Sequence, residues 1–154
     1  MPLVAVVMGS KSDTEALKPT LEILTQLGIE HEVLVISAHR TPDKARQYGL
    51  DARKRGVEVI IAAAGGAAHL PGVLASWTSL PVIGVPLAAG ELAGVDALYS
   101  IVQMPAGIPV AAVAIGSAGA KNAAYLAAEI LGIKYDKIRK AYEKYRAGLQ
   151  GEKP

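Results

Sequence analysis

Five short apolar runs, each of the length of a β-strand, recur along this 154-residue chain. They occupy residues 3–8, 31–37, 57–63, 80–86 and 110–115. The first run is rich in β-branched residues, which favour strands. The third is almost continuously apolar, which is typical of a strand buried on both faces of a parallel sheet. The pattern therefore predicts five strands in a parallel sheet.

Helical patterns follow these runs. Leu17, Leu21, Leu24 and Leu27 recur at steps of three and four residues, and Gly28 is placed to end that helix. Further helices are expected at residues 42–55, around Trp77, at 92–103 and at 120–131. Strand and helix thus alternate five times, which predicts an α/β fold of the flavodoxin-like type, a three-layer α/β/α sandwich around a five-stranded parallel sheet.

A last amphipathic segment, residues 133–148, extends beyond the five strand–helix units. Its apolar stripe consists of Tyr135, Ile138, Tyr142 and Tyr145. Such a stripe is the face of a helix that packs on something. It could pack on its own domain, but a terminal extension is better explained by contact with another subunit. We therefore expect a single catalytic domain, residues 1–154, with an extra C-terminal helix on a neighbouring subunit.

Composition narrows the class of protein. Hydrophobic residues make up 51% of the chain and charged residues 19%, as a sheet covered by helices on both faces requires. Residues 134–154 hold 7 basic and 3 acidic side chains, which leaves 9 basic and 11 acidic in the rest, so no nucleic-acid-binding face is indicated. The absence of Cys excludes disulfides and thiol chemistry. Without a basic leader or a membrane-length apolar run, we expect a soluble protein of the cytoplasm that contacts no membrane.

The first strand opens into a small polar loop, Gly9–Asp13. Free N–H groups at a helix start favour a phosphate, and Ser10 and Ser12 add hydroxyl donors. Asp13 would repel a phosphate but could accept hydrogen bonds from ribose hydroxyls, so the loop fits a sugar phosphate. The glycine patterns of dinucleotide and P-loop sites are absent. The alternative is that Ser12 or Asp13 simply caps the helix.

The segment Ser37–Pro42 joins the second strand to the next helix. Thr41 before Pro42 is typical of an N-cap and first helical residue, which places His39 and Arg40 in a tight turn where α/β sheets bind ligands. An imidazole exchanges protons near neutral pH, and an arginine holds an anion bidentately. The pair predicts proton transfer on an anionic substrate, unless His39 only caps the turn and Arg40 pairs with a helix carboxylate.

The third strand ends in the loop Ala64–Gly72, where the small residues Ala64–Ala68 precede His69. Small residues leave space and expose backbone amides, as close approach to a flat ligand requires. They also suit tight packing between strand and helix, and His69 alone could be structural. Because parallel strands end at the same rim of a sheet, we expect the first three loops to meet.

Four blocks carry a family resemblance: Gly9–Asp13, Ser37–Pro42, Ala64–Gly72 and Ser100–Pro105. In this order they resemble the N5-carboxyaminoimidazole ribonucleotide mutases of purine biosynthesis, the PurE family, over nearly the whole chain. The resemblance implies a homo-octamer with active sites at subunit junctions and no cofactor or metal. It implies an isomerase that converts N5-carboxyaminoimidazole ribonucleotide to 4-carboxy-5-aminoimidazole ribonucleotide by decarboxylation and recarboxylation. It also implies a functional link to an ATP-dependent synthetase that makes the substrate.

The resemblance also implies roles for individual residues. His39 looks like the general acid and base, and His69, which would help to close the pocket, is the second residue assigned to catalysis. Substrate-binding roles fall on Ser10, Ser12, Asp13, Ser37, Arg40, Ala64, Gly65 and Leu70. Of these, the serines of the first loop and Arg40 would hold the 5′-phosphate and Asp13 the ribose. The others would line or close the pocket for the ring and its carboxylate.

Related enzymes and other classes of protein remain as alternatives. A second group in the superfamily carboxylates aminoimidazole ribonucleotide directly and typically has Lys at the position of Arg40, so this chain is closer to the mutases. Its departures from the pattern are Thr14, where an aromatic residue is common, and Ala88–Glu91, which replaces a Ser-rich loop that could cover the site. A flavin-binding module would need aromatic residues on the loops at the rim of the sheet. A scaffold built by oligomerisation alone would not need His39.

Overall fold

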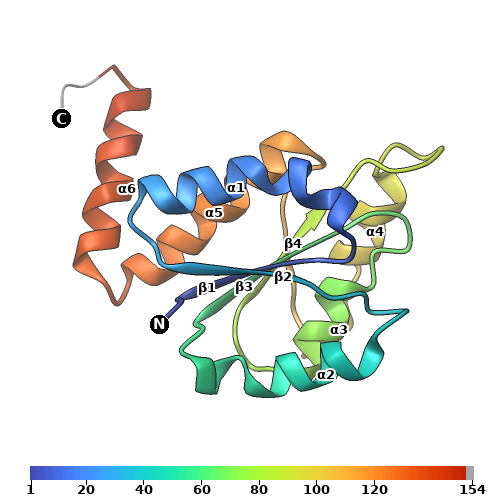
Figure 1. The fold of residues 1–154 in the computed structure, drawn as a ribbon. Helices are drawn as coiled ribbons and strands as arrows, with labels where there is room; N and C mark the ends of the chain where they lie inside the picture. The colour runs from blue at the N-terminus through green and yellow to red at the C-terminus, as the bar shows by residue number, and fades with distance from the viewer. Residues whose placement is uncertain (152–154) are drawn as a thin grey trace.

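The computed structural model describes residues 1–151 (Figure 1). Its strands are β1 (Val4–Met8), β2 (His31–Val35), β3 (Val59–Ala64), β4 (Val82–Pro86) and β5 (Ala111–Ala112). Its α-helices are α1 (Thr14–Gln26), α2 (Pro42–Asp51), α3 (Leu70–Trp77), α4 (Val95–Val102), α5 (Ser117–Gly132) and α6 (Asp136–Leu149). The predicted alternation of strand and helix is confirmed. Within the described residues, none of these helices combines the length and the apolar character needed to cross a membrane.

The sheet is parallel throughout, with the strand order β2-β1-β3-β4-β5. Helices α1 and α5 cover one face, and α2 and α3 cover the other (Figure 1). This arrangement confirms the predicted flavodoxin-like three-layer sandwich. Because β1 and β3 are central, the loops after β1, β2 and β3 emerge side by side at the carboxyl rim.

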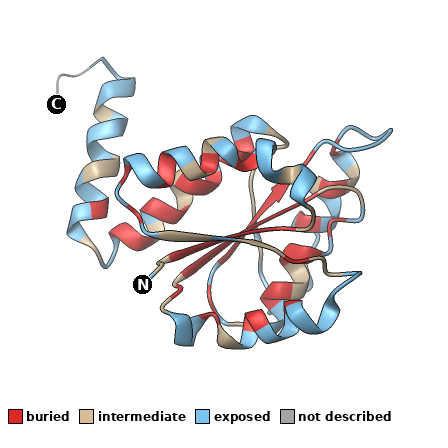
Figure 2. Ribbon diagram, in the orientation of Figure 1, coloured by how far each residue is buried: buried red, intermediate tan, exposed pale blue. Residues whose placement is uncertain are grey.

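Two apolar cores lie on the two faces of the sheet (Figure 2). Successive residues of β1 alternate between them: Val4, Val6 and Met8 face α1 and α5, whereas Ala5 and Val7 face α2 and α3. Every residue of β1 and β3 is buried. The almost continuous apolar run at 57–63 therefore correctly indicated a strand covered on both faces.

Two strands are shorter than their apolar runs. The second was predicted to reach residue 37, but β2 ends at Val35; Ile36 still donates its N–H to the carbonyl of Met8 in β1, and the turn before α2 begins at Ser37. The fifth was predicted over 110–115, and only Ala111–Ala112 pair with β4. Beyond them Val113 and Gly116 each donate one backbone hydrogen bond to β4 as the chain bends toward α5. The two inner strands begin two residues later than predicted, at Val59 and Val82.

Helix ends also differ from the predicted ranges. The helix expected at 42–55 is α2 followed by a short 3₁₀ turn, and Gly56 ends it at a φ of +91°. The helix expected at 92–103 starts only at Val95, because Gly94 before it has a φ of +92°. The helix expected at 120–131 already begins at Ser117. The predicted stop at Gly28 is confirmed by a φ of +69°.

The C-terminal helix was predicted over 133–148 and begins at Asp136, after a tight turn from α5. Its stripe packs on α5 of the same chain: Ile138 is buried, and the Tyr145 ring stacks on Tyr125 with 4.4 Å between ring centroids. The Tyr142 hydroxyl donates to Glu129. The stripe thus packs on its own chain, although Tyr145 remains exposed, and contact of this helix with a neighbouring subunit stays a prediction.

Hydrogen bonds among Glu32, Tyr48 and Arg55 connect β2 to α2 and to the 3₁₀ turn that follows it. Arg55 Nη2 donates to Glu32 Oε2 at 2.5 Å, and the Tyr48 hydroxyl donates to Glu32 Oε1 at 2.7 Å. The hydrogen bonds from Arg55 and Tyr48 hold the pKa of Glu32 below its usual 4.5, although partial burial opposes them. A carboxylate with a lowered pKa stabilises the fold above its unfolded-state pKa, and the contribution is lost as the pH falls through the folded-state value.

We therefore expect Glu32→Gln to lower the free energy of unfolding by about 1 kcal/mol at pH 7, because the charge-assisted bonds weaken. The difference from the parent chain should shrink as the pH falls well below 4.5. Urea unfolding of the variant and the parent chain, at pH 7 and at a pH well below 4.5, measures this difference. Glu30→Gln is the matched control, since Glu30 is exposed and its ion pair within residues 1–151 is with the N-terminus, and it should change little. An equal loss at both pH values would contradict the assignment.

Candidate active site

The loops after β1, β2 and β3 surround a small cleft of about 180 Å³ at the carboxyl rim of the sheet. Its lining consists of Gly9, Asp13, Ser37, Ala38, His39, Arg40, Ala64, Gly65, Ala68, His69 and Leu70. The expected meeting of three loops is therefore observed. Of the residues that the sequence singled out, only Ser10 and Ser12 lie outside this lining, although they belong to the first loop.

Two histidines face each other in the cleft. His39 Nε2 lies 2.6 Å from His69 Nδ1, and the rings meet edge to face with centroids 4.8 Å apart. A bond of this kind needs one ring to donate its N–H and the other to accept, so the pair shares one proton between two bases. Both rings belong to exposed residues at the cleft. This pair can hold or pass a proton at the surface of a bound ligand.

Backbone conformation places His69 in this position. Ala68 before it has a φ of +45°, a left-handed conformation that is unusual for a residue with a side chain. The Ala68 N–H donates to the carbonyl of Gly65, which closes the turn. The contact between the two imidazoles was missed by sequence reasoning, which treated them as separate groups. The sequence indicated only that the two loops end at the same rim of the sheet. It gave no sign that the two imidazoles are in contact.

Arg40 is held by neutral groups. Its N–H and its Nε donate to Ser37 Oγ at 3.1 and 3.4 Å, and its Nη2 donates to the carbonyl of Gly9 at 3.4 Å. Within residues 1–151 no carboxylate forms an ion pair with it, which contradicts the alternative that it pairs with a helix acid. The guanidinium charge therefore remains available to an anion at the cleft.

Thr41 occupies the predicted N-cap position of α2, and Pro42 is the first helical residue. Its side chain does not cap the helix, however. The Thr41 hydroxyl donates to the carbonyl of Ser37 at 2.9 Å and accepts from the Ser37 N–H at 3.2 Å. The hydroxyl points toward the start of the turn, because the N–H and the carbonyl of Ser37 both lie within hydrogen-bonding distance there.

In the first loop, Ser10 is the capping residue. Its Oγ accepts from the N–H and the hydroxyl of Ser12 and caps the 3₁₀ turn Lys11–Asp13. The alternative that the Ser12 or Asp13 side chain caps α1 is therefore wrong, since Asp13 stands at the N-cap without a side-chain bond. Partial burial raises the pKa of Asp13, and a hydrogen bond from the backbone of Ser10 partly offsets this effect. Asp13 thus presents a carboxyl acceptor to the cleft.

The small residues of the third loop have different roles at different positions, and the close packing that is observed involves the loop after β4 rather than a helix. A Cβ at Gly65 would lie 3.0 Å from the Cβ of Ala89 and 3.4 Å from the carbonyl of Leu87, so this glycine allows the loop after β4 to pack closely. At Gly66 a Cβ would meet nothing within 4 Å. Ala64 and Ala68 line the cleft and keep it open. Apart from the two imidazoles, no aromatic ring among the described residues lines it, which disfavours a flavin site.

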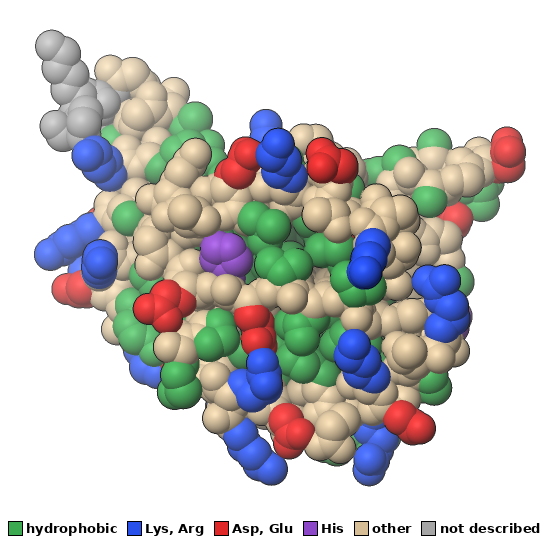
Figure 3. Space-filling model, viewed as in Figure 1, with side chains coloured by type: hydrophobic (Ala, Val, Ile, Leu, Met, Phe, Trp, Pro, Cys, Tyr) green, Lys and Arg blue, Asp and Glu red, His purple; other side chains and the backbone are tan. Residues whose placement is uncertain are grey.

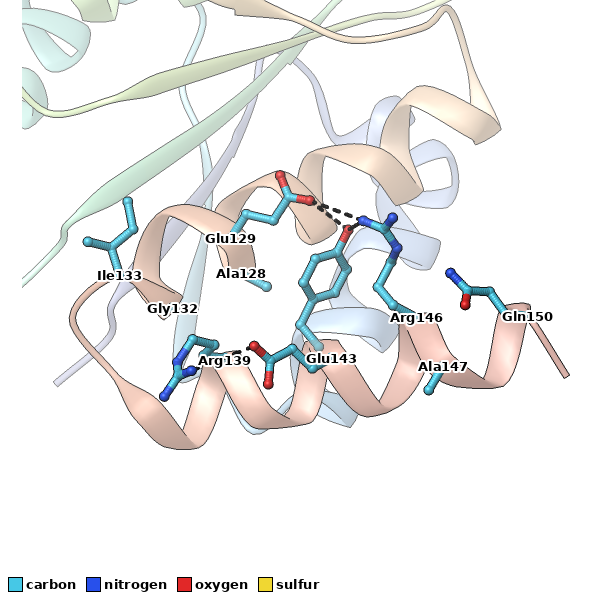
Figure 4. A pocket seen from close by; sticks show the side chains of 10 residues that line it. Ala128, Glu129, Gly132, Ile133, Arg139, Glu143, Arg146, Ala147 and Gln150 are labelled. Carbon is cyan, nitrogen blue, oxygen red and sulfur yellow. Dashed lines mark hydrogen bonds and ion pairs between the residues drawn. The ribbon is translucent and has the colours of Figure 1, made fainter. Parts of the chain in front are cut away.

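A larger groove lies elsewhere, between α5 and α6 (Figure 4). The volume of this groove is about 520 Å³. Its charged groups pair with one another: Arg146 faces Glu129, and Arg139 faces Glu143 (Figure 4). Neutralised pairs offer little to an anionic substrate, and the groove contains no histidine. The smaller cleft at the sheet rim is therefore the stronger candidate for catalysis.

Comparison with known proteins points to one family. A family model described as AIR carboxylase matches residues 3–152. The chain is 63% identical to the N5-carboxyaminoimidazole ribonucleotide mutase of Saccharolobus solfataricus, over 95% of this chain and 94% of that one. It is 54% identical to a bifunctional purine synthesis protein purC/E of Dictyostelium discoideum, over 94% of this chain and 14% of that one. The crystal structure of Treponema denticola PurE matches with a TM-score of 0.87 and 29% identity, covering 98% of this chain and 93% of that one.

Proposed function

We propose a reaction for this chain from one established premise: it belongs to the AIR carboxylase family and is an enzyme. The reaction is the conversion of N5-carboxyaminoimidazole ribonucleotide to 4-carboxy-5-aminoimidazole ribonucleotide in cytoplasmic purine biosynthesis. The observation that carries this proposal is the His39–His69 bond of 2.6 Å beside an arginine without a carboxylate partner in the described chain. Such a site combines proton transfer with binding of a phosphate.

His39 acts as the general acid and base in this scheme. As the bond between the exocyclic nitrogen and the carboxylate carbon breaks, carbon dioxide leaves and His39 donates a proton to that nitrogen. Ring carbon C4 then attacks the carbon dioxide, a new C–C bond forms, and His39 removes the proton from C4. The proton count balances over the cycle, and the substrate undergoes no net oxidation or reduction, so the transfer requires no external oxidant or reductant. His69 orients the His39 ring through their hydrogen bond.

The remaining residues of the cleft bind the ribonucleotide. Arg40 and the serines of the first loop hold the 5′-phosphate, and Asp13 accepts hydrogen bonds from the ribose. Ser37, Ala64, Gly65 and Leu70 line the pocket for the ring and carboxylate, whose enclosure keeps carbon dioxide beside the ring. A separate ATP-dependent synthetase would supply the carbamate substrate. The Dictyostelium relative, named as a bifunctional purine synthesis protein, supports a link to another activity of purine synthesis and does not identify that synthetase.

The proposed assembly is a homo-octamer with active sites at subunit junctions. A cleft of about 180 Å³ is smaller than the several hundred Å³ of usual ligand pockets, which supports completion of the site by a neighbouring subunit. A protruding loop between β4 and α4 carries apolar side chains and an acidic tip (Figure 3). Leu92 of this loop is exposed, and further exposed apolar residues follow along α4: Val95, Tyr99 and Val102. A stripe of this kind is typical of a subunit interface.

The second candidate is direct carboxylation of aminoimidazole ribonucleotide by free carbon dioxide, the activity that the family description names. Arg40 and identities of 55–63% to proteins named as mutases favour the isomerisation. The test compares the two reactions at equal substrate concentration. Faster conversion of freshly made N5-carboxyaminoimidazole ribonucleotide, under conditions where free carbon dioxide cannot account for the product, supports the mutase. Turnover only with aminoimidazole ribonucleotide and bicarbonate assigns the carboxylase instead.

Arg40→Lys should weaken binding of the ribonucleotide by about tenfold, because lysine keeps the charge but loses the bidentate fork. Isothermal titration with aminoimidazole ribonucleotide measures the dissociation constant. The control is Arg53→Lys, since Arg53 also donates to a serine hydroxyl, that of Ser79, but lies away from the cleft. Unchanged affinity in Arg40→Lys would remove this residue from the phosphate site.

A further inference from the structure

Thr41 lies next to the cleft but is not part of its lining, and its side chain is engaged in an unexpected way. It makes a reciprocal pair of hydrogen bonds with the backbone of Ser37, donating to the carbonyl at 2.9 Å and accepting from the N–H at 3.2 Å. The Thr41 N–H donates to the same carbonyl at 3.0 Å. The hydroxyl thus closes the base of the turn that begins where β2 has ended.

Ser37 in turn makes hydrogen bonds to Arg40, which lines the cleft. Its hydroxyl oxygen accepts from the N–H and the Nε of Arg40, whose Nη2 reaches the carbonyl of Gly9 in the neighbouring loop. His39 stands inside the same five-residue turn and makes its bond to His69 from there. The positions of the His39 and Arg40 side chains therefore depend on how Ser37 is held in place.

We propose that Thr41 is a positioning residue that sets the placement of His39 and Arg40 by fixing both backbone polar groups of Ser37. This inference rests on the proposed function for its kinetic consequence, but not for its structural one. Thr41 is exposed, so water can replace its bonds when the hydroxyl is lost, and the backbone bond between residues 41 and 37 remains. Loss of the hydroxyl should therefore loosen the turn without unfolding the chain.

The test replaces Thr41 by Val, which keeps the branched shape, and by Ser, which keeps the hydroxyl. Thr41→Val should lower kcat/KM with N5-carboxyaminoimidazole ribonucleotide about tenfold, and Thr41→Ser should stay near the parent value. The matched control is Thr25→Val, because the Thr25 hydroxyl also donates at 2.9 Å to the carbonyl four residues earlier, at a place remote from the cleft. A parent-like kcat/KM in Thr41→Val would overturn the proposal.

A second readout does not depend on turnover. The chain has 3 histidines, so the imidazole ¹⁵N NMR signals can be assigned individually, with His31 as an internal reference. Thr41→Val should shift the signals of His39 and His69 as their bond weakens, whereas Thr41→Ser and Thr25→Val should leave them in place. Unchanged signals in Thr41→Val would refute positioning by Thr41. If the parent chain lacked mutase activity, only the proposed function would fail, and this spectrum would still decide the role of Thr41.

Discussion

Replacing His39 by Asn is expected to reduce turnover by roughly a thousandfold while leaving folding and ribonucleotide binding largely intact. Asparagine has a similar size and can still hydrogen-bond, but it cannot exchange a proton near neutral pH. The imidazole of His39 lies 2.6 Å from that of His69 at the rim of the cleft and contributes nothing to the two apolar cores. Its loss should therefore affect the chemical step rather than stability.

Rates of product formation, together with titration of aminoimidazole ribonucleotide into the variant, separate chemistry from binding. His31→Asn is the control, because the His31 ring hydrogen-bonds to the carbonyl of Ile29 at the opposite end of β2, and this variant should retain turnover. A scaffold built by association alone would be unaffected by either change. Retained turnover in His39→Asn would exclude this residue as the general acid and base.

Gly119→Ala is expected to destabilise the fold by about 3 kcal/mol or more. Gly119 lies in the first turn of α5 and is buried. A Cβ there would stand 1.6 Å from the carbonyl oxygen of Ala114 and 2.6 Å from its carbon. Both atoms belong to the backbone that leaves β5, so neither can swing aside. The helix would have to move away from the sheet that it covers.

Gly148→Ala provides the comparison for this change. Gly148 lies in α6, where an added Cβ would meet nothing within 4 Å, so alanine should stabilise the helix by about 0.5–1 kcal/mol. Urea unfolding of both variants measures the two effects, which should have opposite signs. If Gly119→Ala unfolded with the same free energy as the parent chain, the close approach of α5 to residue 114 would be wrong.

The amino-acid sequence by itself determined the order and type of the elements. The run at 57–63 is apolar except for Glu58, because the central parallel strand that it contains is buried on both faces, and this requirement is visible in the sequence alone. The stop at Gly28 was equally readable, because a left-handed φ at a helix end favours glycine. The residues of the three loops were readable as well, since polar and small residues interrupt the apolar pattern where strands end.

Only the tertiary structure decided how those loops combine. His39 follows β2 and His69 follows β3, and the two imidazoles meet because the order β2-β1-β3 places their strands on either side of β1. The hydroxyl of Thr41 turns to Ser37 rather than to its own helix for a similar reason. Periodicity records which residues are buried, whereas the partner of a polar side chain depends on which groups the folded chain brings within hydrogen-bonding distance. That choice is made among segments distant in sequence, and it is settled only when the sheet has formed.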